Sequence, residues 1–211
     1  MKKIAVCIPI KGSVHDIFFL NFVTQMLKNS RDYDLFVISS TRMPLDAARN
    51  EILQIAMKSN PDYLWWLDSD TVLPQNINVL QSLIDMDKDM TSALYFRREY
   101  PYHPVFIIVK DGRPCVVKPL PIHQILKVDA VGMGCLLVKK KVFEELMKSE
   151  EPVFEFKQKI FPESIETMGE DINFCLKAKK LGFNLYLNSN IVCGHIGSTV
   201  IDEKIYFKYM E

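Results

Sequence analysis

Two hydrophobic patterns alternate along the first third of the chain. Residues 4–10, 34–40 and 63–67 are short apolar runs, as expected of strands buried on both faces. Residues 14–28 and 45–58, which lie between them, carry apolar side chains at the spacing of a helix with one buried face. Buried strands that alternate with helices predict a parallel sheet with right-handed crossovers, which is an α/β fold.

The rest of the chain is predicted to continue with shorter strands and further helices. Residues 149–167 differ, because they are acidic, contain two prolines and show weak periodicity, so a loop or a poorly ordered arm is expected there. No internal repeat or linker divides the sequence, which predicts a single domain over residues 1–211. The other expected elements are helices at 76–86, 140–147 and 169–181, strands at 90–96, 105–110, 116–117, 134–138, 185–187 and 191–193, and a turn at Asp111-Gly112.

The charge composition argues against two classes of partner. The 26 lysines and arginines balance the 26 aspartates and glutamates, so the formal net charge is zero. A protein that binds mainly nucleic acid or an anionic membrane surface needs an excess of basic side chains, so neither partner is expected. The sequence also has no run of about 18 apolar residues, which predicts that there is no transmembrane segment.

The cysteines and the N-terminal segment bear on the compartment. The five cysteines form no Cys-x-x-Cys pair and mostly lie among apolar residues, which favours buried thiols over disulfides or a zinc site. The apolar run after Met1-Lys2-Lys3 contains Pro9 and ends before Lys11, so it is too short for the core of a signal peptide. These features together predict a soluble, cytoplasmic protein.

The strand predicted at 63–67 is followed directly by Asp68-Ser69-Asp70. In an open parallel sheet, ligands bind at the carboxyl ends of the strands. Two carboxylates at i and i+2 on a turn that leaves such a strand can converge on a divalent cation and its bound diphosphate. The same spacing recurs in polar surroundings or at helix ends, where solvated turns are expected, in Asp32-Tyr33-Asp34, Asp85-Met86-Asp87 and Asp87-Lys88-Asp89. Asp68 and Asp70 are therefore the candidate metal ligands.

Other polar positions each allow two interpretations. Arg49 lies at the edge of the apolar stripe of helix 45–58, where it fits either a solvated flank or a guanidinium directed at a nucleotide. Glu170 and Asp171 begin a helix, where acidic residues interact with the helix dipole, but a carboxylate held there also suits a general base. His195 lies in a Gly-His-Ile-Gly segment past a short strand, which favours a ligand over a core residue, although a lone histidine is more often neither.

Taken together, these segments resemble the GT-A glycosyltransferases, which use nucleotide sugars, in their family 2-like form. The segments occur in the family's order and spacing over nearly the whole chain, and the compact size is similar to that of members encoded by viruses or archaea. The matching segments are residues 4–11, Ala47-Ala48-Arg49-Asn50, residues 62–70, residues 131–138, Gly169-Glu170-Asp171 and His195. The resemblance implies a mixed, mainly parallel, Rossmann-like sheet flanked by helices, with a nucleotide-binding half at about 1–96 and an acceptor and catalytic half at about 97–211.

The same resemblance implies an activity and its cofactors. The protein would transfer a sugar from a nucleotide-diphosphate sugar, with UDP as the first expectation, to a hydroxyl of a glycan, a glycoprotein or a lipid-linked acceptor. The reaction would depend on Mn²⁺ or Mg²⁺ and would invert the anomeric carbon. The cation would stabilise the charge of the leaving diphosphate, and a base on the opposite face of the sugar would activate the acceptor.

The matched positions imply roles at the metal and the donor. Asp70 would ligate the metal directly, Asp68 would face the ribose or the metal, and Ser69 belongs to the same donor-binding segment. His195 would complete the metal site, and its nitrogen donor favours Mn²⁺ over Mg²⁺.

The resemblance also assigns roles around the nucleotide and the acceptor. Arg49 and the loop Pro9-Ile10-Lys11 would contact the nucleotide. Asp171 would be the base that deprotonates the acceptor hydroxyl, and Glu170 would orient the acceptor.

The sequence departs from the family pattern in two places. Ser39-Ser40-Thr41-Arg42 stands where family members often have acidic residues that hold the base, so the identity of the nucleotide stays open. No Gln-x-x-Arg-Trp element follows Asp171, which argues against a processive polysaccharide synthase.

Arg97 and Arg98 allow two interpretations. They either contact the acceptor or the diphosphate, or they form a solvated pair.

Three other functions compete with the glycosyltransferase interpretation. Asp68-Ser69-Asp70-Thr71-Val72 also fits the motif of the haloacid dehalogenase-like phosphatases, in which Asp68 would be the nucleophile, although there the motif normally lies on the first strand. A non-catalytic module that binds nucleotide sugars is a second alternative. A nucleotidyltransferase is less well supported, because it should begin with a Gly-x-Gly-x-Arg loop and residues 8–13 contain only Gly12.

Overall fold

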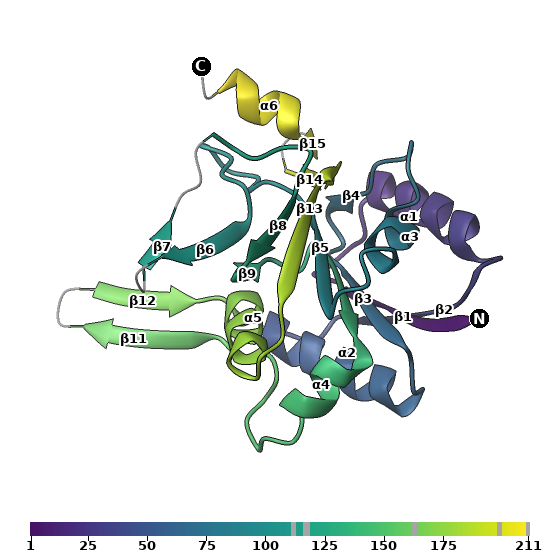
Figure 1. Cartoon of the computed structure of the whole chain (residues 1–211), viewed down its shortest axis with the longest axis horizontal. Coiled ribbons are helices and arrows are strands. Elements are labelled where there is room, and N and C mark those ends of the chain that lie inside the picture. The colour runs from purple at the N-terminus through teal and green to yellow at the C-terminus, as the bar shows by residue number, and fades with distance from the viewer. Residues whose placement is uncertain (111–112, 116–118, 162–163, 198–199, 210–211) are drawn as a thin grey trace.

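A seven-stranded sheet runs through the middle of the molecule, as the computed structural model in Figure 1 shows. The structure describes residues 1–110, 113–115, 119–161, 164–197 and 200–209. The strand order is β2 (Tyr33–Ser40), β1 (Lys2–Pro9), β3 (Tyr63–Leu67), β10 (Cys135–Lys139), β5 (Met90–Leu94), β13 (Leu185–Val192) and β8 (Ile125–Val128). β10 and β8 run antiparallel to their neighbours, whereas β2, β1, β3, β5 and β13 share one direction. This confirms the predicted mixed, mainly parallel sheet.

Each face of this sheet has its own apolar core. Alternate residues of a strand point to opposite faces, so Trp66 packs in one core and its neighbour Trp65 in the other. Every residue of β3 is buried, because helices cover both faces. Buried side chains reach the first core from α2 (Leu45–Lys58), α4 (Lys140–Leu146) and α5 (Glu170–Lys180), and the second from α1 (Asp16–Asn29) and α3 (Val79–Ile84).

A small sheet lies beyond the carboxyl ends of β3 and β13. It consists of β15 (Val200–Ile201), β14 (Gly194–Ile196) and β4 (Thr71–Val72). β14 pairs antiparallel with β4, and this register places His195 opposite Thr71. The pairing therefore brings the segment after Asp68-Ser69-Asp70 next to a histidine that is far away in the sequence. Another small sheet contains β7 (Arg113–Cys115), β6 (Phe106–Lys110) and β9 (Ala130–Val131), and α6 (Glu203–Lys208) follows β15.

The structure corrects the prediction for residues 149–167. β11 (Lys157–Phe161) and β12 (Ser164–Met168) form an antiparallel pair, which extends away from the rest of the molecule in Figure 1. Its described ends, including Gln158 and Thr167, are exposed, so burial imposes no apolar alternation at these positions that the sequence could show.

Other boundaries also differ from the sequence-based prediction. The strands expected at 185–187 and 191–193 are one strand, β13, with an irregularity between Asn188 and Val192. The sequence pattern missed β8 and α6, because the first alternates weakly and the second, with six residues, is too short to show a helical period. The strand predicted at 116–117 and the turn at 111–112 lie outside the described residues.

Cys7, Cys135, Cys175 and Cys193 are buried and form no disulfide, which confirms the prediction of buried thiols for these residues. Burial raises the pKa of Cys7 well above its usual value, as expected of an unreactive thiol in a core. Among the helices that the structure describes, none combines the length and apolarity needed to span a membrane.

Candidate functional site

A cleft of about 920 Å³ opens at the carboxyl ends of β1 and β3. Its walls come from the loops after these strands, the start of α5 and the small sheet that carries His195. The lining includes most of the residues that the sequence analysis singled out, namely Pro9, Ile10, Lys11, Asp68, Ser69, Asp70, Arg97, Arg98, Asp171 and His195. The position agrees with the general rule that ligands bind beyond the carboxyl ends of strands in open α/β sheets.

Asp70 interacts with two cationic or potentially cationic side chains in the cleft. Its Oδ2 lies 3.3 Å from His195 Nε2 and 2.8 Å from Arg98 Nη1. Burial alone would raise the pKa of Asp70, but the hydrogen bond with His195 and the charges of His195 and Arg98 outweigh it and lower this pKa. Burial alone would lower the pKa of His195, but the bond and charge of Asp70 raise it.

The main chain fixes the orientation of the His195 ring. Nδ1 lies 2.8 Å from the carbonyl oxygen of Phe96, which can only accept a hydrogen bond, so Nδ1 carries a hydrogen. The other ring nitrogen, Nε2, faces Asp70. In the charged ring Nε2 also carries a hydrogen, whereas in the neutral ring its lone pair points toward Asp70. A histidine held through Nδ1 in this way is typical of metal ligands.

Arg49 joins two acidic residues behind the cleft wall. Its Nη2 lies 2.9 Å from Asp68 Oδ1 and its Nε 3.0 Å from Glu170 Oε1, while the residue is only 1% exposed. Nη1 is also buried and has no hydrogen-bond partner among the described residues. A direct contact of Arg49 with a nucleotide stays a prediction, and it would require the guanidinium to leave one of these carboxylates. In this structure Arg49 ties the end of β3 to the start of α5.

Glu170 and Asp171 have different settings although they are neighbours at the start of α5. Glu170 is 4% exposed and points to Arg49, whereas Asp171 lines the cleft. Asp171 Oδ1 also accepts a hydrogen bond from the Ile172 amide at 2.7 Å. A Cβ at Gly169 would lie 2.6 Å from the same oxygen, so this orientation of Asp171 requires glycine at position 169. Burial raises the pKa of both carboxyls, although the charge of Arg49 opposes it.

The sequence analysis did not identify Tyr95, which also lines the cleft. Its hydroxyl accepts a hydrogen bond from the Gly134 amide at 3.2 Å, and its ring meets the His195 ring edge-to-face at 5.7 Å. A Cβ at Gly132 would lie 1.8 Å from the Tyr95 hydroxyl, and one at Gly134 would lie 2.9 Å from the ring. The two glycines in Gly132-Met133-Gly134 were therefore the feature of the sequence that could have indicated a large side chain packed against this segment.

The donors in the cleft suit a divalent cation in part. Asp70 Oδ2 and His195 Nε2 converge at 3.3 Å and combine the oxygen and nitrogen ligands that Mn²⁺ accepts. Among the described residues, no group of three His, Cys, Asp or Glu is arranged to hold a metal ion. Oxygens of a bound diphosphate or water would therefore have to complete the coordination, and Arg98 would have to move off Asp70.

No protein-family model matches the chain, and no curated protein matches its sequence. Solved structures are nevertheless similar in fold. A197 from STIV superposes with a TM-score of 0.61 at 18% identity, covering 93% of this chain and 86% of that one. GalNAc-T7 with UDP, GalNAc and Mn²⁺ gives 0.56 at 14% identity, covering 99% of this chain and 47% of that one. A putative glucose-1-phosphate thymidylyltransferase from Bacillus anthracis, in complex with sucrose, gives 0.54 at 9% identity, covering 99% and 96%.

The fold is of the GT-A type. At identities this low, the similarity establishes a shared fold and does not identify a substrate. The family 2-like assignment and the roles of individual residues stay predictions.

Proposed function

We propose that the protein is a metal-dependent glycosyltransferase that transfers a sugar from a nucleotide-diphosphate sugar to an acceptor hydroxyl. The observation that carries this proposal is the presence of Asp70, His195 and Asp171 in one cleft, where two can hold a cation and the third can accept a proton. The GT-A fold supports it. UDP and Mn²⁺ are the first donor and metal to test, because both are bound in the GalNAc-T7 structure.

Asp70 and His195 would hold the cation, with Asp68 beside them. When bound, the cation would offset the negative charge that the leaving diphosphate gains as the glycosidic bond breaks. Lys11, Arg97 and Arg98 also line the cleft and would attract the same diphosphate. The loop Pro9-Ile10-Lys11 would contact the nucleotide, as its place in the cleft allows.

Asp171 would act as the base. The acceptor hydroxyl would give its proton to a carboxylate oxygen of Asp171 while the hydroxyl oxygen attacks the anomeric carbon from the face opposite the leaving group, which inverts that carbon. Burial raises the pKa of Asp171, which makes it a stronger base than an exposed aspartate. Arg49 and Glu170 would act as positioning residues, because they connect the first turn of α5 to Asp68.

The first test is stabilisation of the protein by UDP with Mn²⁺ or Mg²⁺ in a thermal-shift series that includes other nucleoside diphosphates. A nucleotide present at 100 times its Kd should add roughly 2.7 kcal/mol of stability. Asp70→Ala should lose this response, whereas Asp32→Ala, in another Asp-x-Asp segment, should keep it because Asp32 is exposed and lies outside the cleft. A response that survives in Asp70→Ala would refute the assigned metal site.

The second test separates transfer from binding. Asp171→Asn should keep the nucleotide-dependent stabilisation but lose sugar transfer, because an amide cannot accept the proton. Near-normal turnover of Asp171→Asn would refute the assigned base. Cleavage of p-nitrophenyl phosphate with Mg²⁺, lost in Asp68→Asn, would instead support the phosphatase alternative.

A nucleotidyltransferase shares the fold, as the thymidylyltransferase neighbour illustrates. It would form a nucleotide sugar from a nucleoside triphosphate and a sugar phosphate. The absence of a glycine-rich loop in residues 8–13 argues against this chemistry. Pyrophosphate release from such a mixture would contradict the glycosyltransferase proposal.

A further inference from the structure

A group of three tyrosines, two of them exposed and one half-buried, lies beside the cleft and takes no part in the chemistry described so far. Tyr100 and Tyr102 lie on the loop after β5, and Tyr209 lies at the end of α6. The ring centroids are 6.1 Å apart for Tyr100 and Tyr102, 6.2 Å for Tyr100 and Tyr209, and 5.4 Å for Tyr102 and Tyr209. We call Tyr100, Tyr102 and Tyr209 the tyrosine cluster.

The tyrosine cluster is continuous with the cleft. Arg97, Arg98 and Glu99 line the cleft before the cluster, and Pro104 lines it after. The Arg97 amide donates to the His103 carbonyl at 2.9 Å, and an isolated bridge pairs Phe96 with Pro104. The segment is therefore a narrow loop whose base forms part of the cleft wall and whose tip carries two of the three tyrosines.

The tyrosine cluster is held in place yet leaves ring surface accessible. Tyr206 of α6 is buried and stacks on Phe96 at 4.8 Å, which fixes the helix against the base of the loop. Tyr100 and Tyr209 remain 70% and 50% exposed. All three ring contacts are edge-to-face, an arrangement that does not bury both faces of each ring.

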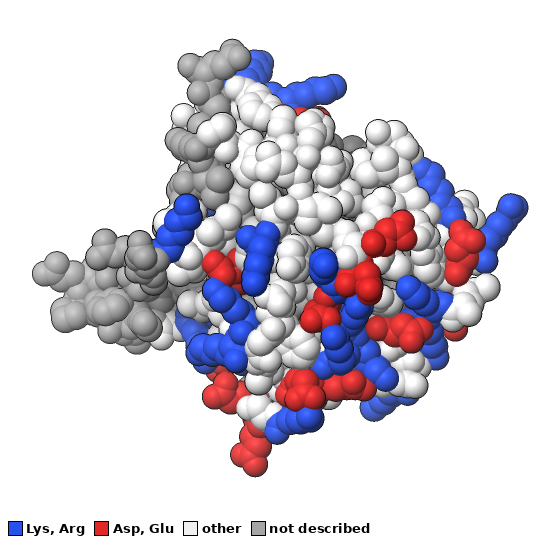
Figure 2. All heavy atoms as spheres, in the orientation of Figure 1, with Lys and Arg blue, Asp and Glu red and all other residues white. Residues whose placement is uncertain are grey.

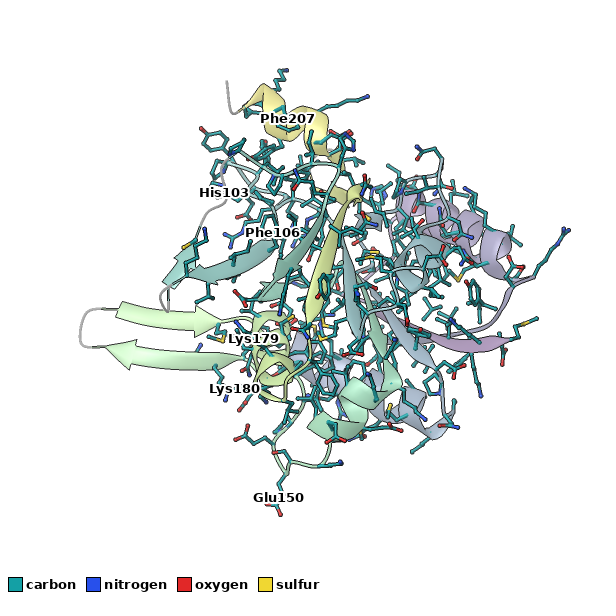
Figure 3. The ribbon with its side chains drawn as sticks, viewed as in Figure 1. His103, Phe106, Glu150, Lys179, Lys180 and Phe207 are labelled. Atoms are coloured by element: carbon teal, nitrogen blue, oxygen red, sulfur yellow. The ribbon has the colours of Figure 1, made fainter. Side chains whose placement is uncertain are left out.

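The backbone at the tip has an unusual conformation. Tyr102 has a φ of 53°, in the left-handed region that bulky residues rarely adopt, and its amide donates to the Glu99 carbonyl at 2.8 Å. Residues held in such conformations are often part of ligand sites. In Figure 3, His103 marks the loop and Phe207 marks α6, both in the upper part of the molecule.

The chemistry of the tyrosine cluster fits a carbohydrate. A tyrosine offers a flat apolar ring with a hydroxyl at its end, and a pyranose offers a face of C–H groups with hydroxyls around it. Tyrosine also loses little conformational entropy on binding, since it has few rotatable bonds. The upper part of the molecular face in Figure 2, below α6, is mostly uncharged, whereas basic and acidic side chains intermingle lower down. Next to the tyrosine cluster there are charges of both signs, since Lys208 Nζ lies 5.8 Å from the centroid of the Tyr209 ring and Arg98 and Glu99 precede Tyr100. The rings themselves, and not the surface charge, therefore indicate the ligand.

We propose that the tyrosine cluster binds an oligosaccharide acceptor. The terminal sugar enters the cleft with its hydroxyl toward Asp171, and the following sugars stack on Tyr100 and Tyr209. The assignment as an acceptor site rests on the proposed glycosyltransferase function, but carbohydrate binding by the tyrosines does not. Among a glycan, a glycoprotein and a lipid-linked acceptor, the structure assigns recognition to the glycan itself.

Binding can be measured without a donor. Protein with ¹³C-labelled tyrosine rings is titrated with cellotriose and with tri-N-acetylchitotriose, whose equatorial substituents leave flat C–H faces. Weak, millimolar binding of at least one sugar should shift the ring signals of Tyr100 and Tyr209. Tyr100→Ala and Tyr209→Ala should each weaken binding roughly tenfold, while the corresponding Phe substitutions should keep most of it.

A matched control excludes a general effect of removing an exposed ring. Phe19 on α1 is 56% exposed and lies outside the cleft, so Phe19→Ala should bind both sugars as the wild type does. Circular dichroism of each Ala variant checks that it is folded, and the Phe variants test the idea independently if an Ala variant is not. Shifts with neither sugar, or equal binding by the Ala and wild-type proteins, would overturn the proposal. Self-association through the tyrosines that neither sugar displaces would also overturn it.

The outcome can be separated from that of the proposed function. Stabilisation of the wild type by UDP and Mn²⁺ without any sugar shift would leave the transferase proposal intact and refute the tyrosine cluster as a carbohydrate site. Sugar shifts without a nucleotide response would do the reverse. If both are seen, Tyr100→Ala should raise the KM for the oligosaccharide acceptor more than it lowers kcat, because it removes acceptor binding remote from the reacting atoms.

Discussion

Asp68 and Asp70 belong to one short motif, and each carboxylate contacts an arginine. The two arginines differ strongly in their exposure to solvent. The side chain of Arg49, on Asp68, is 2% exposed, whereas that of Arg98, on Asp70, is 54% exposed. The two distances are nearly equal, at 2.9 Å and 2.8 Å. The two carboxylates are also similarly exposed, at 27% for Asp68 and 30% for Asp70, so the difference lies in the solvent access of the arginines and not in the contact itself.

Solvent access decides what each pair can do. A buried pair has already lost its hydration, so removing one partner leaves an uncompensated charge in the interior. An exposed pair exchanges with water at little cost, so either partner is free to bind something else. We infer that the Asp68 half of the motif is an anchor for α5 and that the Asp70 half is the part available to a ligand.

The largest expected effect is that of Arg49→Met. It would leave Glu170 and Asp68 without their shared cation. The pair with Glu170 is buried on both sides, and breaking such a pair costs about 3–5 kcal/mol. Because burial already raises the pKa of Glu170, protonation of this carboxyl would relieve part of the cost, so the lower end is expected. The free energy of unfolding in urea measures it.

Arg42→Met is the matched control, because Arg42 also lines the cleft but its side chain is 63% exposed. Its Nη1 lies 3.7 Å from Glu51 Oε1, which is a longer contact than those of Arg49. It should change the free energy of unfolding by less than about 1 kcal/mol. If Arg49→Met lowers the free energy of unfolding no more than Arg42→Met does, the distinction between Asp68 as an anchor and Asp70 as available to a ligand is wrong.

An intermediate effect is expected for Asp171→Asn, and its size depends on pH. Burial raises the pKa of Asp171 in the folded protein above its ordinary value of 3.8. As pH rises from 3.8 through the folded-state pKa, the unfolded chain releases its proton first, so the wild type loses stability over this range. Asn cannot ionise, so Asp171→Asn should be more stable than the wild type at neutral pH.

The gain should disappear as the pH falls toward 3.8, because Asp171 is then protonated in both states. Thermal unfolding across this range measures the difference, with Asp32→Asn as the control at an exposed position. A variant that is less stable than the wild type at neutral pH would show that the ionised carboxylate contributes to the fold. The expected cost of the native carboxylate is typical of groups kept for chemistry.

The strands that lead into the cleft, and the carboxylate that follows one of them, could be predicted from the sequence because each depends on neighbouring residues alone. β1 and β3 are readable because burial on both faces makes them continuous apolar runs, and Asp68 follows β3 directly. The direction of β10 is not readable, since a buried strand has the same composition whether it runs parallel or antiparallel. The ends of β11 and β12 whose exposure the structure describes, including Gln158 and Thr167, are exposed, so no apolar alternation marks them in the sequence.

Contacts between distant segments were the main part that the sequence could not supply. Arg49 and Glu170 are 121 positions apart, and nothing in either segment specifies the other. Asp70 and His195 meet because β14 pairs with β4, two short strands without a sequence signal. The resemblance to a family placed these residues in one site. The structure keeps Asp68, Asp70 and Asp171 in the cleft lining, whereas Glu170 is buried behind it against Arg49.

The smallest effect on stability is expected for Arg98→Met. This variant is also the most direct test of whether Asp70 is available to a ligand. Loss of one exposed pair should change the free energy of unfolding by less than about 1 kcal/mol. Under the proposed function, the same change removes a competitor from Asp70 Oδ2, so Mn²⁺ titrated calorimetrically without nucleotide should bind more tightly than to the wild type. The neighbouring Arg97 lines the cleft but has no carboxylate within 4.0 Å among the described residues, so Arg97→Met should leave Mn²⁺ binding unchanged. Equal Mn²⁺ affinity in Arg98→Met and the wild type would mean that Asp70 is no more available to a cation than Asp68.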